Sequence, residues 1–395
     1  MIPGSDPAVT PARVLVVDDL EVNRDLLARR LSRMGHTVVC VNDGQQAVDS
    51  VRRESWDLVL LDVMMPVLDG IGALTAIKAD PATRHVPVIM ISANTEIESV
   101  VKCIELGADD YLPKPFDPVL LRARVSSSLE KKRFRDREQA YARRMQRDLE
   151  VGARIQRDFL PEDLPTVTGY EFAARFEPAR EVGGDFYDAL VLADGSVVLV
   201  LGDVCDKGVG AALFMALFRT LIRAGSLAET EVSSAETPGA RVLRVVSRTN
   251  DYIAQTHGRT NMFATLFVGL LDPVSGAVAY VNGGHEPPRV LRADGTIRAL
   301  LAPTGPAVGM LPGIPFTEGA VTLDAGETLF VLTDGVTESR NPAGALLGDL
   351  AVDTLVQSEP RSADALVTVV LGAVMAHAAG EPPADDVTML AVRRA

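Results

Sequence analysis

The sequence contains little cysteine and no long uncharged apolar run. Its three cysteines, Cys40, Cys103 and Cys205, are scattered unevenly and lack metal-ligand spacing, which argues against a disulfide framework. A membrane span needs about eighteen consecutive apolar residues, and because none is present we expect no contact with a membrane. Met1–Pro11 lacks the basic and apolar regions of a signal peptide. We therefore expect a cytoplasmic protein.

An excess of positive charge is also missing. The chain has 39 Lys and Arg against 53 Asp and Glu, a formal net charge of −14, which argues against general binding to the phosphates of nucleic acid. Its 395 residues, 47% of them hydrophobic, predict two packed domains and a connector. The expected limits are a flexible tail at 1–12, a first domain at 13–130, a helical linker at 131–165 and a second domain at 166–395.

The first domain alternates apolar, β-branched runs with amphipathic helical patterns. Val14–Val17, Leu58–Leu61 and Val86–Ile91 are such runs. Near-continuous apolar strands are typical of a parallel sheet covered on both faces, so we expect a doubly wound, five-stranded α/β domain. Functional side chains in such a domain lie beyond the carboxyl ends of the strands.

Charged and polar residues stand at these expected strand ends. Asp18 and Asp19 follow the first strand, Asp62 the third, Ser92 the fourth and Lys114 the fifth. Carboxylates can hold Mg²⁺, and a lysine can hold a phosphoryl group as a point charge. A carboxylate beside Mg²⁺ can itself attack phosphorus to form an acyl phosphate. Any one of these residues could be a loop cap, but their recurrence at successive strand ends favours a site.

This pattern resembles a two-component receiver domain. Leu61-Asp62-Val-Met-Met-Pro66 is similar to the phosphoacceptor loop of that family, and Lys114-Pro115 to its Lys-Pro pair with a cis peptide bond. The resemblance implies phosphorylation of Asp62 by a sensor histidine kinase or phosphotransfer protein, with Mg²⁺ on Asp19 and Asp62. Ser92 and Tyr111 would report phosphorylation by moving toward the site. The alternative is that Tyr111 is only an aromatic ring on the surface. The implied receiver site comprises Asp18, Asp19, Asp62, Ser92, Tyr111 and Lys114.

Acidic residues also recur at expected strand ends in the second domain. A hairpin turning at Asp194-Gly195 would return Asp203 to the end of the sheet where Asp185 lies. Asp334 follows an apolar strand, and Asp385-Asp386 precedes the last one. Aspartate alone favours turns and caps. Four acidic sites brought together would repel unless a hard divalent cation lay between them, so we expect a metal site.

The order of these motifs resembles a PPM-type phosphatase of the SpoIIE/RsbU branch, from about Gly169 to the C-terminus. The resemblance implies an α+β domain of layered antiparallel sheets flanked by helices; turns at Ser275-Gly276 and Asp294-Gly295 independently favour antiparallel strands. The matching motifs are Val182-Gly-Gly-Asp-Phe-Tyr187, Gly202-Asp-Val204, Lys207-Gly-Val209, Met262-Phe-Ala-Thr265, Asn282-Gly-Gly-His285, Thr333-Asp-Gly-Val336 and Asp385-Asp-Val-Thr388.

The phosphatase resemblance implies two Mn²⁺ or Mg²⁺ ions and catalytic roles for the aspartates that hold them. Asp203 would bridge the ions, the Val204 carbonyl would bind one, and Asp334 and Asp385 would complete the other. Whether Asp185 binds metal directly or through water stays open. The weaker candidates, behind the ligands, are Asp188 and Asp386. We interpret His285 as a positioning residue rather than a proton donor, and Cys205 as structural.

The linker is rich in strong helix formers. Tyr141, Met145, Leu149, Ile155 and Phe159 form an approximate apolar stripe. A parallel coiled coil in a homodimer is the favoured interpretation; a single helix folded back on its own domains is the alternative. Ile155-Gln-Arg-Asp-Phe-Leu160-Pro161 resembles the segment that often precedes this phosphatase branch, which makes the linker a candidate transmission rod.

The sequence therefore predicts a response regulator in which phosphorylated Asp62 controls a metal-dependent protein serine/threonine phosphatase. The resemblance implies a STAS-domain anti-sigma-factor antagonist as substrate, in a partner-switching pathway; activation and inhibition are both open. A non-catalytic scaffold is the alternative, although all the expected aspartates are present. Gly183-Gly184-Asp185-Phe186 also resembles part of a cyclic-dinucleotide synthase motif, but the extra acidic residue of that motif is missing.

Overall fold

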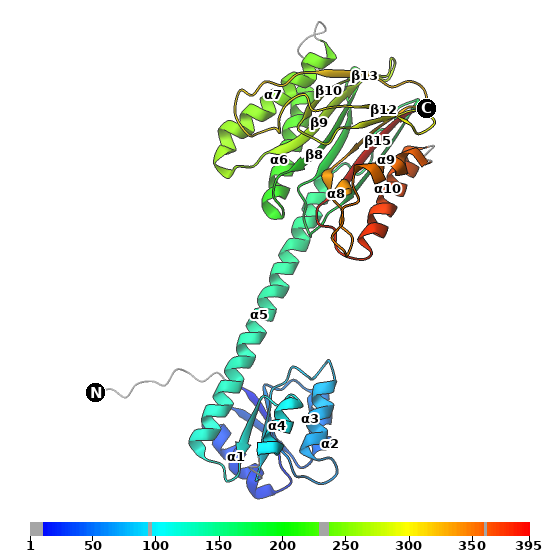
Figure 1. Ribbon diagram of the computed structural model, residues 1–395. Helices are drawn as coiled ribbons and strands as arrows, with labels where there is room; N and C mark the ends of the chain where they lie inside the picture. The colour runs from blue at the N-terminus through cyan, green and yellow to red at the C-terminus, as the bar shows by residue number, and fades with distance from the viewer. Residues whose placement is uncertain (1–10, 94–96, 229–236, 359–361) are drawn as a thin grey trace, which may run out of the picture. The chain divides into compact units, whose positions relative to one another are not determined.

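The chain forms two compact units, Met1–Met145 and Gln146–Ala395. The computed structural model describes residues 11–93, 97–228, 237–358 and 362–395. The flexible tail expected at 1–12 therefore lies, up to residue 10, outside the described residues. Figure 1 shows the order of the elements in each unit.

The first unit contains a five-stranded parallel sheet in the order β2-β1-β3-β4-β5, which confirms the predicted doubly wound fold. Alternate residues of each strand enter different cores: Leu15 and Val17 pack on one face, Val14 and Val16 on the other. Burial on both faces explains the continuous apolar runs. The elements are β1 Arg13–Val17, α1 Glu21–Arg33, β2 Thr37–Val41, α2 Gly44–Arg53, β3 Leu58–Asp62, α3 Gly70–Ala79, β4 Val88–Ser92, α4 Ile97–Glu105 and β5 Asp110–Pro113.

Helix α5 runs without a break from Pro118 to Phe159. The helical linker expected at 131–165 thus begins earlier, inside the first domain, because neither proline nor glycine interrupts the sequence between Val119 and Val151. Its first turns bury Leu121, Val125 and Leu129 in the core of the first unit. The limit expected at 130/131 does not coincide with the end of a helix.

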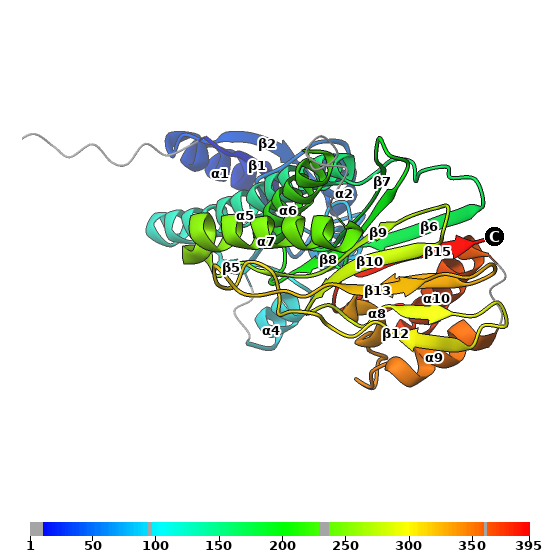
Figure 2. The same ribbon diagram turned by 90° about the horizontal axis from the view of Figure 1, so that it is seen from above.

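The second unit contains two five-stranded antiparallel sheets, β13-β10-β9-β8-β7 and β12-β11-β14-β15-β6, as expected. Helices α6 and α7 pack on the first sheet and α9 and α10 on the second (Figure 2). The elements are β6 Tyr170–Glu177, β7 Phe186–Val191, β8 Val197–Val204, α6 Val209–Ala228, α7 Pro238–His257, β9 Ala264–Leu271, β10 Ala277–Gly283, β11 Arg289–Leu291, β12 Ile297–Leu300, β13 Gly319–Thr322, β14 Thr328–Leu332, α8 Asp334–Thr337, α9 Asp349–Ser358, α10 Ala363–Ala378 and β15 Val387–Arg394.

The three expected hairpin turns are present between β7 and β8, β9 and β10, and β11 and β12. Their second residues, Gly195, Gly276 and Gly295, have φ of 82°, 81° and 86°. Glycine adopts this left-handed conformation without the steric penalty that a Cβ brings. The turns therefore fix the register of each hairpin, so that its second strand ends beside the residue where its first strand begins.

Helix α6 is long and apolar enough to cross a membrane by length and composition alone. One face of it is nevertheless part of a protein core, and two arginines on it, Arg219 and Arg223, pair with the buried Asp188 of β7. Such pairing is typical of a core helix in a folded domain. The buried residues of the helix are Ala211, Met215, Phe218, Ile222 and Ser226.

Candidate functional sites

In the first unit, the parallel strands bring the predicted carboxylates together at one end of the sheet. Asp18, Asp19 and Asp62 each offer an oxygen within 4.8 Å of the others. Lys114 Nζ lies 2.8 Å from an Asp18 oxygen and 2.9 Å from an Asp62 oxygen. The Lys114–Pro115 bond is cis, as expected.

Ser92 and Tyr111 complete the set of predicted receiver residues. Ser92 ends β4 and is buried, and the Tyr111 hydroxyl donates to its backbone carbonyl at 3.4 Å. This contact places the tyrosine beside the strand end instead of leaving it as an isolated surface ring. The structure thus brings all six residues to the carboxyl end of the sheet.

The charges of this first site favour a bound divalent cation. Burial raises the pKa of Asp62, although the hydrogen bond and charge of Lys114 oppose the rise. Burial acts to lower the pKa of Lys114, but its hydrogen bonds to Asp18 and Asp62 outweigh burial and raise that pKa. One lysine faces three carboxylates, so excess negative charge remains. Hard oxygen donors of this kind fit Mg²⁺.

In the second unit, the antiparallel strands gather the predicted aspartates from distant parts of the chain. Phe186 of β7 pairs with Gly202 of β8, so Asp185 and Asp203 flank the same pair. Asp334 begins α8 directly after β14, and Asp385 precedes β15. Because β14 and β15 pair antiparallel, these two residues also share one end of their sheet.

Asp185 is the most enclosed member of this acidic site, with 2% of its surface exposed. Its Oδ2 accepts hydrogen bonds from the hydroxyls of Thr333 at 2.8 Å and Thr388 at 2.6 Å. Burial, followed by the charges of Asp203 and Asp386, raises the pKa of Asp185 well above its ordinary value. A buried carboxylate held in this way is pre-formed for a cation.

The other carboxylates of the acidic site also repel one another. Burial and the neighbouring charge of Asp334 raise the pKa of Asp203 to about 7. Burial and Asp385 raise the pKa of Asp334. Lys207 Nζ lies 2.8 Å from Asp385 Oδ2 and balances part of the charge at the partly exposed rim. The donor set therefore fits hard divalent ions such as Mg²⁺ or Mn²⁺.

The acidic site of the second unit is wider than that of the first. Within the described ranges, only the receiver carboxylates form a group of three whose oxygens all lie within 4.8 Å of one another.

Asp386 holds the loop that carries Asp185. Its Oδ2 accepts from the backbone N–H groups of Gly184 at 2.6 Å and Asp185 at 3.4 Å, and its Oδ1 from that of Ala179 at 2.8 Å. A Cβ at Gly183 would overlap the Asp386 carboxylate. A Cβ at Gly184 would come within 2.7 Å of the Val204 carbonyl oxygen, so both glycines are needed for close approach, and Asp386 supports the loop through its hydrogen bonds.

Asp188, His285 and Cys205 lie outside the carboxylate group. Asp188 pairs with Arg223 at 2.8 Å and Arg219 at 3.1 Å, so it anchors α6 to β7. His285 is buried, and burial lowers its pKa to about 4, which leaves the ring neutral at pH 7. Its Nδ1 lies 2.8 Å from the Thr265 hydroxyl. A neutral, buried ring agrees with a positioning role.

Sequence reasoning did not assign roles to Thr333, Thr388 or Lys207. All three stand inside motifs quoted for the family resemblance, next to or near an expected ligand. That adjacency was the available signal. Which carboxylate each side chain contacts depends on strand pairing across as many as 203 residues of sequence.

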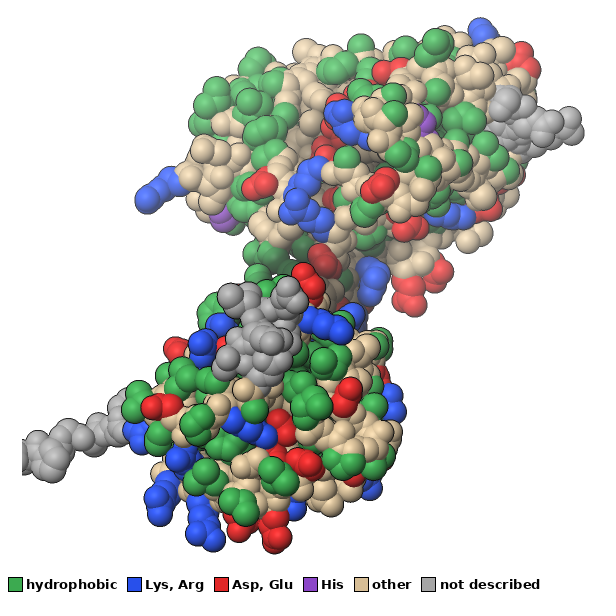
Figure 3. All heavy atoms as spheres, turned by 60° about the horizontal axis from the view of Figure 1, so that its bottom comes forward, with side chains coloured by type: hydrophobic (Ala, Val, Ile, Leu, Met, Phe, Trp, Pro, Cys, Tyr) green, Lys and Arg blue, Asp and Glu red, His purple; other side chains and the backbone are tan. Residues whose placement is uncertain are grey.

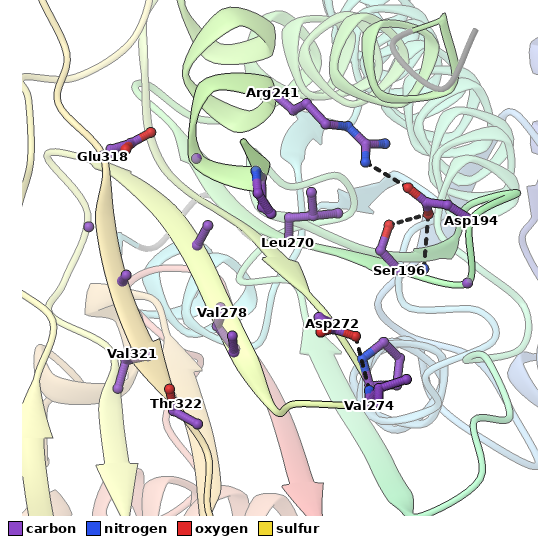
Figure 4. Close-up of a pocket in the computed structure, with 18 of the residues that line it drawn as sticks. Asp194, Ser196, Arg241, Leu270, Asp272, Val274, Val278, Glu318, Val321 and Thr322 are labelled. Carbon is purple, nitrogen blue, oxygen red and sulfur yellow. Dashed lines mark hydrogen bonds and ion pairs between the residues drawn. The ribbon is translucent and has the colours of Figure 1, made fainter. Parts of the chain in front are cut away.

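A cavity of about 900 Å³ lies at the other end of the first sheet of this unit (Figure 4). It is lined by the β7–β8 turn, the start of α7, and β10 and β13. Arg241, which lines it, pairs with Asp194 at 2.7 Å. Since Asp194 lies in the turn, the cavity is separated from Asp185 and Asp203 by the length of the hairpin. It is not part of the acidic site.

Acidic, basic and apolar side chains are interspersed over both units on the face that Figure 3 shows. The two groups of carboxylates at strand ends are therefore the candidate functional sites.

Comparisons with known proteins agree with this division. Residues 193–395 match the family described as Stage II sporulation protein E (SpoIIE), and residues 14–126 match the response regulator receiver domain. Protein IcfG of Synechocystis is 33% identical over 96% of this chain and 58% of its own length. Response regulator PleD of Caulobacter vibrioides is 34% identical over 62% of this chain and 56% of its own. The chain thus spans little more than half of each relative.

A solved structure supports the fold of the second unit. The SiaA-PP2C domain of Pseudomonas aeruginosa has a TM-score of 0.54 at 20% identity, and the match covers 64% of this chain and 98% of that domain. This likeness concerns fold alone. The SpoIIE match extends over more than half of the chain and includes three of the four main aspartates. The chain therefore belongs to the SpoIIE family of PPM-type phosphatases and carries a response regulator receiver domain.

Proposed function

We propose that this chain is a response regulator in which phosphorylation of Asp62 controls a metal-dependent protein serine/threonine phosphatase. The proposal rests on four aspartates that lie at strand ends of the two antiparallel sheets and act on one another's pKa, namely Asp185, Asp203, Asp334 and Asp385. The domain limits we propose are 13–130 for the receiver, 131–165 for the linker and 166–395 for the phosphatase. Both family matches, 14–126 and 193–395, fall inside these limits.

In the phosphatase, Asp203, the Val204 carbonyl, Asp185, Asp334 and Asp385 would hold two Mn²⁺ or Mg²⁺ ions. Bound divalent ions supply Lewis-acid stabilisation of phosphoryl oxygens and activation of water for in-line attack on a phosphate monoester.

Neighbouring groups of the chain would keep this phosphatase site in place. Thr333 and Thr388 fix the Asp185 carboxylate, and Asp386 fixes the backbone next to it. Lys207, at the rim, adds a positive charge that can attract the substrate phosphate.

In the receiver, the Asp62 carboxylate would take a phosphoryl group from the phosphohistidine of a kinase or phosphotransfer protein. Mg²⁺ on Asp19 and Asp62 would offset the charge of the acyl phosphate. Lys114 already contacts Asp62 and would hold the added group. Ser92 and Tyr111, in contact at the same sheet end, would respond to it.

We further propose a STAS-domain anti-sigma-factor antagonist as substrate, in a cytoplasmic partner-switching pathway. The family resemblance supports this choice. Comparing turnover of phosphorylated STAS-domain proteins with turnover of a generic phosphoserine protein tests it. Equal rates on both would contradict it.

The first test of the proposed function is phosphate release from a phosphoserine protein by the full-length chain with Mn²⁺, with and without beryllofluoride. We expect beryllofluoride to change the rate by about 5- to 150-fold, the usual range of coupling between two sites. In Asp62→Asn the effect should vanish, because the acceptor carboxylate is missing. Mn²⁺-dependent activity that beryllofluoride does not change would contradict control by the receiver. No activity with or without beryllofluoride would favour a non-catalytic scaffold.

We also propose that α5 pairs with a second copy of the chain in a parallel coiled coil. Phe134, Tyr141, Met145, Ile155 and Phe159 are exposed large side chains on this helix. Their spacings of 7, 4, 10 and 4 residues fit one heptad seam. Leu149, which the sequence placed in the stripe, falls one position off this seam. Exposures of 69% for Tyr141 and 53% for Met145 show how much apolar surface a partner helix could cover.

Replacing both Tyr141 and Met145 by lysine should convert the dimer to a monomer. Each buried apolar side chain contributes about 1.5–3 kcal/mol, so the dissociation constant should rise at least roughly a hundredfold. Light scattering coupled to size-exclusion chromatography measures the mass. Gln139→Lys with Ala140→Lys adds the same charge off the seam and should leave the dimer intact. A double seam variant that stays dimeric would count against the coiled coil.

A further inference from the structure

The C-terminal part of α5 is bound directly to the loop that carries Asp185. Gln156 Nε2 donates to the Gly183 carbonyl at 2.5 Å, and Gln156 Oε1 accepts from the Gly183 N–H at 3.0 Å. One side-chain amide therefore pairs with both backbone polar groups of a single buried residue. Among side chains, the planar amide of Gln or Asn combines a donor and an acceptor in this way.

Gln156 is also the buried side chain of this part of the helix. From 146 to 159 it is the one buried side chain of α5, with 5% of its surface exposed. One turn before it, the helix backbone passes close to the loop, since a Cβ at Gly152 would lie 3.7 Å from Val182 Cγ1. Leu160, directly after the helix, packs in the core of the unit, and the two hydrogen bonds of Gln156 attach the helix to the backbone of the loop.

The same loop is held from the opposite side by Asp386, which accepts from the N–H groups of Gly184 and Asp185. Gly183 thus lies between Gln156 and Asp386, two residues before the Asp185 carboxylate. Without the amide, the buried N–H and C=O of Gly183 would lack partners, and the loop would relax to expose them. The Asp185 carboxylate would then leave its place against Thr333 and Thr388.

We infer that Gln156 is a positioning residue for the phosphatase site, which sets the Gly183–Asp185 loop and through it the affinity for divalent metal. This inference rests on the proposed metal-dependent phosphatase. It places a determinant of the site on α5, the helix that begins at Pro118 in the receiver unit.

The test measures Mn²⁺ binding to the full-length protein by the electron paramagnetic resonance signal of free Mn²⁺, with no substrate present. Gln156→Met keeps the length of the side chain and removes both hydrogen bonds, whereas Gln156→Glu keeps the acceptor and loses the donor. Gln146→Met is the matched control, because Gln146 is exposed on the same helix. Asp19→Asn together with Asp62→Asn in every variant removes two of the three receiver carboxylates, so that the signal reports chiefly on the phosphatase site.

We expect Mn²⁺ affinity to fall at least roughly tenfold in Gln156→Met, less in Gln156→Glu, and not at all in Gln146→Met. The rate at saturating Mn²⁺ should stay near that of the parent, so that the half-saturating Mn²⁺ concentration moves and the maximal rate does not. Affinities within about twofold of the parent in both Gln156 variants would overturn the inference, even if their melting temperatures fell. If Gln156→Met does not fold, Gln156→Glu decides by the same criterion. A parent that binds no Mn²⁺ would overturn the proposed function itself, and the inference with it.

Discussion

Replacing Asp203 by asparagine should lower metal-dependent phosphate release by roughly a thousandfold or more, because strong charge stabilisation is lost at the reacting phosphate. Burial and the charges of Asp334 and Asp385 raise the pKa of Asp203, and burial and the charge of Asp203 raise that of Asp185, so Asp203 lies among the other carboxylates of the acidic site. A neutral amide offers one good oxygen donor and cannot balance two cations. Initial rates over a series of Mn²⁺ concentrations measure the loss.

The Asp203→Asn protein should remain folded. Its side chain is almost isosteric, and it removes a negative charge that burial and Asp334 disfavour. We therefore expect the metal-free variant to melt no lower than the metal-free parent. Asp206→Asn, in the exposed turn that follows β8, is the matched control and should keep its rate within about twofold. An Asp203→Asn protein that retains about a tenth of the parent rate would contradict the assigned role.

Replacing Gly335 by alanine should destabilise the phosphatase unit and weaken its metal site together. A Cβ there would overlap the backbone carbonyl of Asp386, and a backbone cannot rotate away as a side chain can. Overpacking of this kind costs about 1–3 kcal/mol or more, which corresponds to a melting temperature lower by roughly 2–12 °C. The displaced strand end also carries Asp385, so half-saturation should need more Mn²⁺.

Gly372→Ala provides the control for this substitution. Gly372 lies in the exposed middle of α10, and a Cβ there would meet nothing within 4 Å. Alanine favours a helix over glycine by about 1 kcal/mol, so this variant should melt at the same temperature or higher. Differential scanning calorimetry of both variants with and without Mn²⁺ measures the contrast. A Gly335→Ala protein that melts within about 2 °C of the parent would show that the contact relaxes easily.

Local patterns in the sequence were enough to predict the parallel sheet of the first domain and the antiparallel hairpins of the second. Continuous apolar runs such as Val14–Val17 indicate strands buried on both faces, and Asp-Gly turns such as Asp194-Gly195 indicate antiparallel hairpins. The end of the last receiver helix was not predictable, because the same helix-forming composition continues beyond Leu129 to Phe159. The amino-acid composition of α5 changes too little around Leu129 to mark the boundary between the receiver domain and the linker.

The sequence by itself also determined which carboxylates stand at strand ends, since topology places the ends of adjacent strands together. Only the tertiary structure decided how those carboxylates are held. The Asp185 carboxylate accepts hydrogen bonds from the hydroxyls of Thr333 and Thr388. Asp188 forms ion pairs with two arginines of α6, and the Gln156 amide forms hydrogen bonds with the backbone of Gly183. Strand and turn formation depend on neighbours a few residues apart, which a sequence displays directly. Contacts between residues 27 to 203 positions apart depend on how whole elements pack, and no local pattern encodes them.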